Sequence, residues 1–215
     1  MQPQCTMRLL ARALHTRVAD RHTQRWHYCP RRHDAAPRRQ TQARGRQAYV
    51  ASERRPLIID IEASGFGARS YPIEVGVALH DGRKFCSLIL PAPDWTHWDK
   101  DAEQVHRVSR DILETYGKPM AEVTAQLNDL LEGCTLYTDG WVVDRPWLTT
   151  LFHAARTPMR FHVSPLEMIL TEAQMETWHA TKNEVVASLA DVRHRASYDA
   201  WIIQETWQRT RDASR

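Results

Sequence analysis

A short apolar run near residue 60 has the composition of a buried β-strand. It lies between Pro56 and Gly65, residues of types that commonly bound strands, and its hydrophobic positions are mostly β-branched: Leu57, Ile58, Ile59 and Ile61. Asp60 and Glu62 interrupt the run, and side chains two positions apart on a strand point to the same face. A buried carboxylate must be paired or must hold a metal ion, and residues 57–68 contain no Lys or Arg. The pattern indicates either a divalent cation beside the strand or two solvated carboxylates at its end.

The next residues predict two more strands in an antiparallel meander. A loop over residues 63–71 contains two glycines. Apolar residues then alternate with others over residues 73–79, and Asp81-Gly82 is a hairpin turn signal before a third strand-like stretch over residues 84–90.

The second half of the chain alternates between helix and strand patterns. Apolar residues recur at i, i+4, i+7 and i+8 over residues 123–131, which predicts an amphipathic helix ended by Gly133. The other predicted elements are short helices near 101–106 and 111, a strand at 134–138, a helix at 144–155, a strand at 160–163 and a helical C-terminal stretch. Three strands followed by alternating helices and strands predict an α/β fold with a mixed five-stranded sheet and helices on its faces.

The charge is distributed unevenly along the chain. The 215 residues carry a formal net charge of +3, but residues 1–55 contain 13 Arg against three acids, whereas residues 56–215 contain 16 basic and 23 acidic residues. The first region is poor in β-branched residues and has no lasting periodicity, so we expect no packed core there. The sequence therefore predicts a basic N-terminal extension over residues 1–55 and one domain over residues 56–215.

Three interpretations of the basic region stay open. A transit peptide would explain a short amphipathic turn over residues 9–14, although Ser is scarce. A basic arm lying on nucleic acid is the second. The third is that the region is not translated, because no Met occurs between Met7 and Met120, and a Val codon such as that of Val50 can start translation in bacteria. We expect an unstructured extension or a mis-assigned start.

Composition also predicts the compartment. No apolar run approaches the roughly 18 residues of a membrane span, so we expect a soluble protein without a membrane partner. The four cysteines, Cys5, Cys29, Cys86 and Cys134, show no C-x-x-C spacing, and the last two lie in apolar runs. This is typical of reduced core thiols in a cytoplasmic protein.

Three further residues are candidates for the same site as the first two acids. Asp144 is predicted to open the helix after the fourth strand, and open α/β sheets gather ligands at the carboxyl ends of their strands. His194 and Asp199 lie five residues apart before and within the last predicted helix. At about 100° per residue they would face apart if both were helical, so His194 is expected in the preceding loop.

Together these motifs resemble the DEDD-type 3′–5′ exonucleases of the histidine subclass, which have a ribonuclease H-like fold. The resemblance covers about residues 56–211. Asp60-Ile-Glu62-Ala-Ser-Gly is similar to the family's first motif, usually Asp-x-Glu-Thr-Thr-Gly, and His194-Arg-Ala-Ser-Tyr-Asp199-Ala resembles the third. His106-Arg-Val-Ser is also similar to the family's His-Gly-Ile-Thr segment.

The second motif departs from the family pattern. The family often has His-Asn before a Phe-Asp pair, whereas this chain has Asp139-Gly-Trp-Val-Val-Asp144. Asp144 falls at the metal-binding position and Asp139 at that of the usual histidine. Which carboxylate serves as the ligand therefore stays open.

The resemblance implies a metal-dependent exonuclease that releases nucleoside 5′-monophosphates from the 3′ ends of single-stranded RNA or DNA. Oxygen ligands suit Mg²⁺ or Mn²⁺ better than zinc, and two such ions can clamp an in-line phosphoryl displacement. The implied ligands are Asp60, Glu62, Asp144 and Asp199, with Asp60 bridging both ions. His194 is the implied general base, because the pKa of histidine lies near the operating pH.

Flanking residues are expected to bind the substrate. The backbone at Ala63, Ser64 and Gly65 would hold the terminal sugar, and Phe66 would stack on the last base, with a place in the core as its alternative. His106 is also expected to bind substrate. Weaker candidates for base stacking or phosphate contact, with ordinary structural roles as the alternative, are Trp95, Trp98, Trp141, Arg107, Arg145 and Arg195.

Other functions and partners are weighed against this prediction. A catalytically impaired nuclease-like module that only binds nucleic acid is the alternative function. The chain ends 16 residues after Asp199, so we expect a free-standing enzyme without a tail for docking on a polymerase. A homodimer is implied only by analogy with ribonuclease T and oligoribonuclease. The choice between RNA and DNA depends on contacts to the 2′-OH that the sequence does not reveal.

Overall fold

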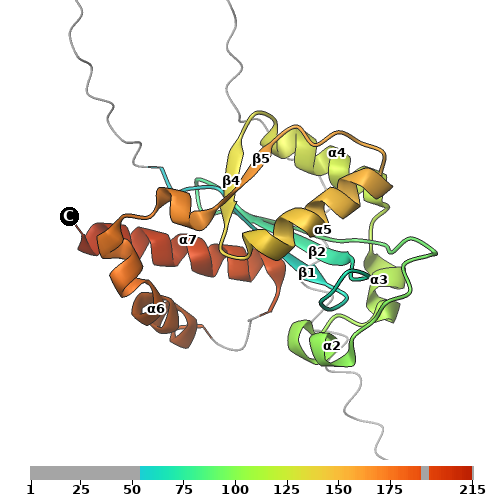
Figure 1. The fold of residues 1–215 in the computed structure, drawn as a ribbon, viewed down its shortest axis with the longest axis horizontal. Coiled ribbons are helices and arrows are strands. Elements are labelled where there is room, and N and C mark those ends of the chain that lie inside the picture. The colour runs from blue at the N-terminus through green and yellow to red at the C-terminus, as the bar shows by residue number, and fades with distance from the viewer. Residues whose placement is uncertain (1–53, 190–193, 215) are drawn as a thin grey trace, which may run out of the picture.

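The computed structural model describes residues 54–189 and 194–214, which form a five-stranded sheet with helices on both faces (Figure 1). The strands are β1 (Ile58–Ala63), β2 (Pro72–Ala78), β3 (Lys84–Leu88), β4 (Thr135–Thr138) and β5 (His162–Pro165). Their order across the sheet is β3-β2-β1-β4-β5. The first three strands pair antiparallel, and β4 pairs parallel with β1 and with β5. The predicted mixed α/β sheet is confirmed.

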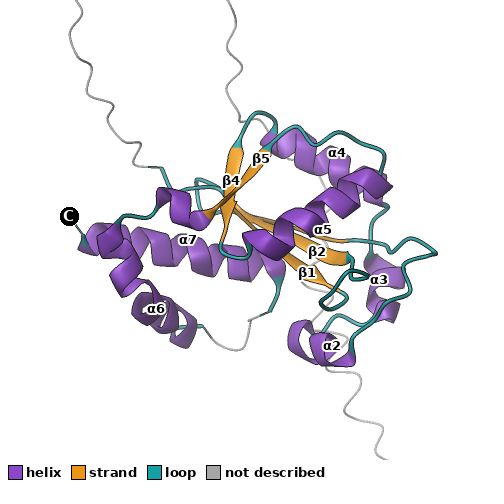
Figure 2. Cartoon of the chain, viewed as in Figure 1, coloured by secondary structure: helices purple, strands orange, loops and turns teal. Residues whose placement is uncertain are grey.

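Helices make up the two outer layers (Figure 2). They are α2 (Lys100–His106), α3 (Arg110–Tyr116), α4 (Met120–Leu131), α5 (Trp141–Ala154), α6 (Glu172–Ala187) and α7 (Ala196–Ala213), with a 3₁₀ turn, η1 (Leu166–Ile169). Residues of α4 and α5 share one apolar cluster with the sheet, and residues of η1, α6 and α7 share a second one. The prediction of helices on both faces is therefore confirmed.

Strand β1 contributes to both clusters because its side chains alternate. Ile59 and Ile61 pack with α4 and α5, whereas Ile58 packs with α7. Asp60 and Glu62 lie two and four positions after Ile58, and therefore share its face. The geometry of the strand thus places both acids on the side of the sheet that α7 covers.

A glycine on β2 lets α7 approach the sheet closely. A Cβ atom at Gly76 would lie 2.1 Å from the carbonyl carbon of Ala196 and 2.1 Å from the backbone nitrogen of Ser197. The first turn of α7 therefore rests directly on the backbone of β2. Further along α7, Ala200 and Ile203 belong to the same apolar cluster as Ile58.

Two element boundaries differ from the sequence prediction. The fifth strand covers His162–Pro165 rather than residues 160–163. The helix after the fourth strand begins at Trp141, so Asp144 lies in its first turn instead of opening it. The helix starts early because the N–H of Asp144 already donates a helical hydrogen bond of 2.9 Å to the carbonyl of Gly140.

The expectation of a core cysteine is wrong for Cys86, which is exposed because β3 lies at the edge of the sheet. Cys134 is half-buried and packs against the apolar cluster that contains residues of α4 and α5. Cys5 and Cys29 belong to residues 1–53, which lie outside the described residues, as does nearly all of the predicted basic extension.

Within the described part of the chain, no helix combines the length and the apolar character that crossing a membrane requires.

Candidate metal centre

Carboxylates from β1 and α7 meet on one face of the sheet. Asp60, Glu62 and Asp199 each offer a carboxylate oxygen, and these atoms all lie within 4.8 Å of one another. The three residues line a hollow of about 220 Å³ together with residues from the turn after β4, from α6 and from the segment before α7. The structure therefore brings together acids that are up to 139 positions apart in the sequence.

Burial and mutual repulsion make two of these acids, Asp60 and Glu62, resist ionisation. Burial, followed by the charges of Asp144, Glu62 and Asp199, raises the pKa of Asp60 well above its usual value. Burial, followed by the charges of Asp199 and Glu74, raises the pKa of Glu62 to about 8, against a smaller lowering by Arg195. A divalent cation among such carboxylates would favour their charged forms. The oxygen donor set fits Mg²⁺ or Mn²⁺.

The two acids of the divergent second motif have different surroundings. Asp144 is only 3% exposed, and its Oδ2 accepts a hydrogen bond from the hydroxyl of Thr138. Burial raises the pKa of Asp144 to about 7, although that hydrogen bond acts in the opposite direction. Asp139 instead lines the hollow, where its Oδ2 lies 2.5 Å from Nζ of Lys182. Asp144 is thus a buried neighbour of Asp60, and Asp139 already forms an ion pair.

His194 lines the same hollow, directly before α7 begins at Ala196. Its predicted place in the loop before the helix is confirmed. The backbone φ of His194 is 64°, in the left-handed region that residues other than glycine seldom adopt. Surrounding contacts must hold such a conformation in place.

The comparison with known proteins identifies the fold of this chain. No protein-family model matches the sequence, and no curated protein is significantly similar to it. Among solved structures, the zinc-bound form of the E. coli exonuclease I complex with single-stranded DNA superposes with a TM-score of 0.59 at 12% identity, over 75% of this chain and 41% of that one. The nuclease domain of 3′hExo, a DEDDh family member bound to rAMP, gives a TM-score of 0.55 at 15% identity, over 75% of this chain and 94% of that one.

A third solved structure agrees with these two. S. pombe Pop2p in its Mg²⁺- and Mn²⁺-bound form gives a TM-score of 0.54 at 13% identity, over 74% of this chain and 84% of that one. The chain has the fold of the DEDD-type exonucleases. It spans about 41% of the exonuclease I chain, and at these identities the likeness concerns the fold.

In this exonuclease fold the loop after β1 turns back tightly. The hydroxyl of Ser64 accepts a hydrogen bond from the N–H of Tyr71 and lies 3.1 Å from Nδ1 of His97. The N–H of Ser64 donates to the carbonyl of Tyr71, and its carbonyl accepts from the N–H of Asp99. Because Ser64 is engaged in this way, the expectation that its amide holds a terminal sugar is corrected. Ala63, Ser64 and Gly65 are all buried.

Phe66 is exposed, unlike Ala63, Ser64, Gly65 and His106. It is 75% exposed, and its ring centroid lies 6.0 Å from that of Trp147. The alternative of a core position for Phe66 is therefore wrong. Its ring is therefore available for stacking, within the loop that follows the two acids of β1.

His106 lies in the interior, which corrects the expectation that it contacts substrate. It is only 2% exposed, and its Nδ1 accepts a hydrogen bond from the N–H of Val108. Two of the tryptophans considered for base stacking also have partners within the protein: Trp95 stacks on Tyr71, and Trp98 packs edge-on against His106.

Two residues in or beside the centre were missed in the sequence. Lys182 of α6 reaches the hollow, but nothing in the polar pattern of that helix marks it. Glu74 of β2 is fully buried and pairs with Arg195, whose side chain keeps 39% of its surface exposed, so the structural role considered for Arg195 is present in the structure. A carboxylate within the apolar run of residues 73–79 was the available signal for Glu74.

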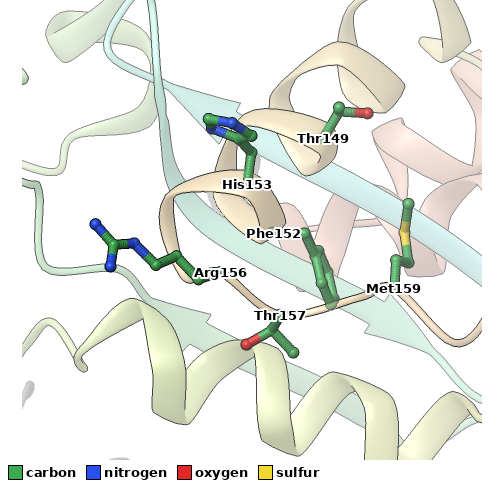
Figure 3. Close-up of a pocket in the computed structure, with 6 residues that line it drawn as sticks. All are labelled: Thr149, Phe152, His153, Arg156, Thr157 and Met159. Carbon is green, nitrogen blue, oxygen red and sulfur yellow. The ribbon is translucent and has the colours of Figure 1, made fainter.

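A second hollow, of about 460 Å³, lies at the C-terminal end of α5 and shares no residue with the acidic one (Figure 3). Its lining contains no carboxylate; the residues are Thr149, Phe152, His153, Arg156, Thr157 and Met159. Of these two hollows, only the first is lined by carboxylates.

Proposed function

We propose that the protein is a metal-dependent 3′–5′ exonuclease that releases nucleoside 5′-monophosphates from the ends of single-stranded RNA or DNA. The observation that carries the proposal is the convergence of Asp60, Glu62 and Asp199 within 4.8 Å, in a hollow that His194 also lines. The fold shared with exonucleases supports the same conclusion.

The carboxylates are the proposed ligands of two divalent ions. Asp60, Glu62 and Asp199 would hold one ion, and Asp144 would join Asp60 at the other, because its charge is the strongest of those acting on the pKa of Asp60. When bound, such ions lower the pKa of the attacking water and neutralise the leaving 3′-oxygen. Asp139 is the weaker candidate for a ligand, since it pairs with Lys182.

The remaining steps belong to protein side chains. His194 stands at the edge of the acidic hollow, where its neutral imidazole would take a proton from the attacking water. Phe66 would stack on the terminal base, because its exposed ring can form a π-contact with any base. A platform that tolerates every base fits a substrate without sequence preference.

The solved relatives support the class of substrate. Exonuclease I of E. coli was solved in complex with single-stranded DNA, and 3′hExo with rAMP, so a DNA strand and a ribonucleotide are both bound by proteins of this fold. Pop2p was solved with Mg²⁺ and Mn²⁺. The cytoplasmic location, the homodimer and the action as a free-standing enzyme stay predictions from the sequence and its family resemblance.

The test uses the full chain with 5′-labelled single strands of RNA and DNA in Mg²⁺ or Mn²⁺. Wild-type protein should shorten the strands from the 3′ end and release 5′-monophosphates, whereas Asp60→Asn should be inactive. Asp212→Asn is the matched control, because it makes the same change on the exposed last turn of α7. Equal activity in Asp60→Asn, or products shortened from the 5′ end, would contradict the proposal.

The alternative is a nuclease-like module that binds nucleic acid without cleaving it. The ion pair of Lys182 with Asp139 inside the hollow favours it, because an ammonium group there opposes a metal cation. Lys182→Met separates the two functions. An exonuclease should stay active or gain activity in this variant, whereas a pure binding module should bind strands and cleave none under any metal condition.

A further inference from the structure

An ion pair between a buried carboxylate and a partly exposed guanidinium joins β2 to the start of α7. Glu74 on β2 is fully buried, and Arg195 precedes α7 by one residue. Nη2 of Arg195 lies 2.7 Å from Oε1 of Glu74, and Nε lies 3.0 Å from Oε2. This is the two-pronged contact of a guanidinium with a carboxylate, which fixes direction as well as distance.

Other donors complete the surroundings of the Glu74 carboxylate. The thiol of Cys86 on β3 donates to Oε1 at 2.8 Å, and the N–H of Ala196 donates to Oε2 at 3.4 Å. Glu74 therefore binds both the side chain of Arg195 and the backbone of the next residue. It does so from outside the acidic hollow, whose lining includes neither Glu74 nor Arg195.

These contacts hold Arg195, the residue directly after His194. The imidazole of His194 lines the hollow, while its backbone has a φ of 64°. On its C-terminal side, Arg195 is held by Glu74, and the backbone of Ala196 is pressed against Gly76. A side chain on a strained residue stays in one position only when its neighbours are fixed. Here the two neighbours, Arg195 and Ala196, are fixed to β2.

We propose that Glu74, acting through Arg195, is a positioning residue that holds the His194 imidazole over the carboxylates of the metal centre. The inference rests on the proposed nuclease function for its kinetic consequence, since His194 is the proposed base. Its structural part, that Glu74 and Arg195 set the position of His194, is independent of any activity.

Single substitutions are ambiguous at this pair. Glu74 lies directly opposite Glu62 across β1 and β2, so Glu74→Gln would leave Arg195 free to pair with Glu62 and disturb the metal centre. Breaking one half of a buried pair also leaves an uncompensated charge, which destabilises the fold. Replacing both partners with neutral residues of similar size avoids both effects.

The decisive variant is the double substitution Glu74→Gln/Arg195→Met in the full chain. Its kcat should fall roughly 30- to 100-fold, the size of effect that a misplacement of about 1 Å produces. Its KM and the Mg²⁺ concentration for half-maximal activity should each stay within about threefold of wild type, since the carboxylates and Phe66 are untouched. The matched control is Glu205→Gln/Arg209→Met, which removes the ion pairs of Glu205 with Arg209 and Arg55 further along α7 and should keep the wild-type kcat.

A folded double variant with kcat within about threefold of wild type would overturn the proposal, because the pair would then serve stability alone. Should the double variant fail to fold, Arg195→Lys decides. Lysine keeps the charge but loses the two-pronged contact, so kcat should fall by roughly tenfold at unchanged KM, and a wild-type kcat would contradict the inference.

A readout without turnover separates this inference from the proposed function. The imidazole resonance of His194, assigned by its loss in His194→Gln, should shift or broaden in the Glu74→Gln/Arg195→Met variant but not in the control. If wild-type protein cleaves no nucleic acid, the proposed function fails and this resonance decides alone. A resonance that coincides with that of wild type would then overturn the positioning role.

Discussion

At the scale of single residues, Glu62 makes both the stability of the fold and the affinity of the metal centre depend on pH. Its pKa is about 8 against an ordinary value of 4.5, mainly because it is buried. Between these two values the folded chain binds more protons than the unfolded chain. The free energy of unfolding of the metal-free protein therefore falls as pH rises through this window. Metal binding requires the charged carboxylate, so affinity for Mg²⁺ rises over the same range.

Glu62→Gln should therefore stabilise the metal-free protein at pH 8 and have little effect at pH 4.5. Each unit of pKa shift corresponds to about 1.4 kcal/mol, so a gain of roughly 1–3 kcal/mol is expected at pH 8. Thermal unfolding in EDTA at the two pH values measures it, with Glu184→Gln on the exposed surface of α6 as the control. A lower melting temperature for Glu62→Gln at pH 8 would contradict the raised pKa.

Phe66 offers a residue-scale test of substrate binding that leaves the fold intact. Because the ring is 75% exposed, Phe66→Ala should not change the melting temperature. Loss of base stacking, worth about 1–3 kcal/mol per base, should weaken single-strand binding and raise KM. Fluorescence anisotropy with a labelled strand measures this, and Tyr116→Ala is the control, because Tyr116 is also an exposed aromatic residue. Equal affinities in the two variants would remove Phe66 from the binding site.

At the scale of elements, the site depends on how α7 is seated on the sheet. The alternation along β1 decides which face carries Asp60 and Glu62, but a separate contact decides that Asp199 meets them. That contact is the close approach of the first turn of α7 to Gly76. The sequence predicted both elements and the loop position of His194. The close approach was not predictable, because a glycine within a strand pattern does not reveal which backbone it admits.

Gly76→Ala should displace the start of α7 and with it Asp199. A Cβ atom would lie 2.1 Å from the backbone of Ala196, and such overpacking costs about 1–3 kcal/mol. Chemical denaturation should show this loss, and metal affinity should fall with it. Gly82→Ala is the comparison: it meets nothing within 4 Å but has a φ of +80°, so it should cost about 1–2 kcal/mol without changing metal affinity. Unchanged metal affinity in Gly76→Ala would mean that α7 tolerates the shift.

At the scale of the whole molecule, charge opposes the proposed substrate. Residues 56–215 contain 16 basic and 23 acidic residues, and several of the acids surround the proposed active site. A polyanion therefore gains little from this domain until bound cations reverse the local charge. The charge balance and the two acids of β1 on which this dependence rests are visible in the sequence. It did not predict Lys182, which contributes a charge from a helix with no marked apolar face.

Removing metal should therefore weaken binding as well as cleavage. Single-strand affinity measured by anisotropy should drop at least about tenfold in EDTA relative to Ca²⁺, chosen as a divalent cation with oxygen ligands. Asp60→Asn should show a much smaller difference between the two conditions. Wild-type affinity that is the same in EDTA and in Ca²⁺ would indicate that strands bind away from the acidic hollow.

The central claim is that the acids of β1 and α7 form a site for divalent cations. Anomalous diffraction from crystals of the full chain grown with Mn²⁺ tests it most directly. The account predicts a manganese peak among the carboxylates of Asp60, Glu62 and Asp199, and none there in crystals of Asp60→Asn. Well-ordered wild-type crystals in saturating Mn²⁺ with no peak between these side chains would contradict it.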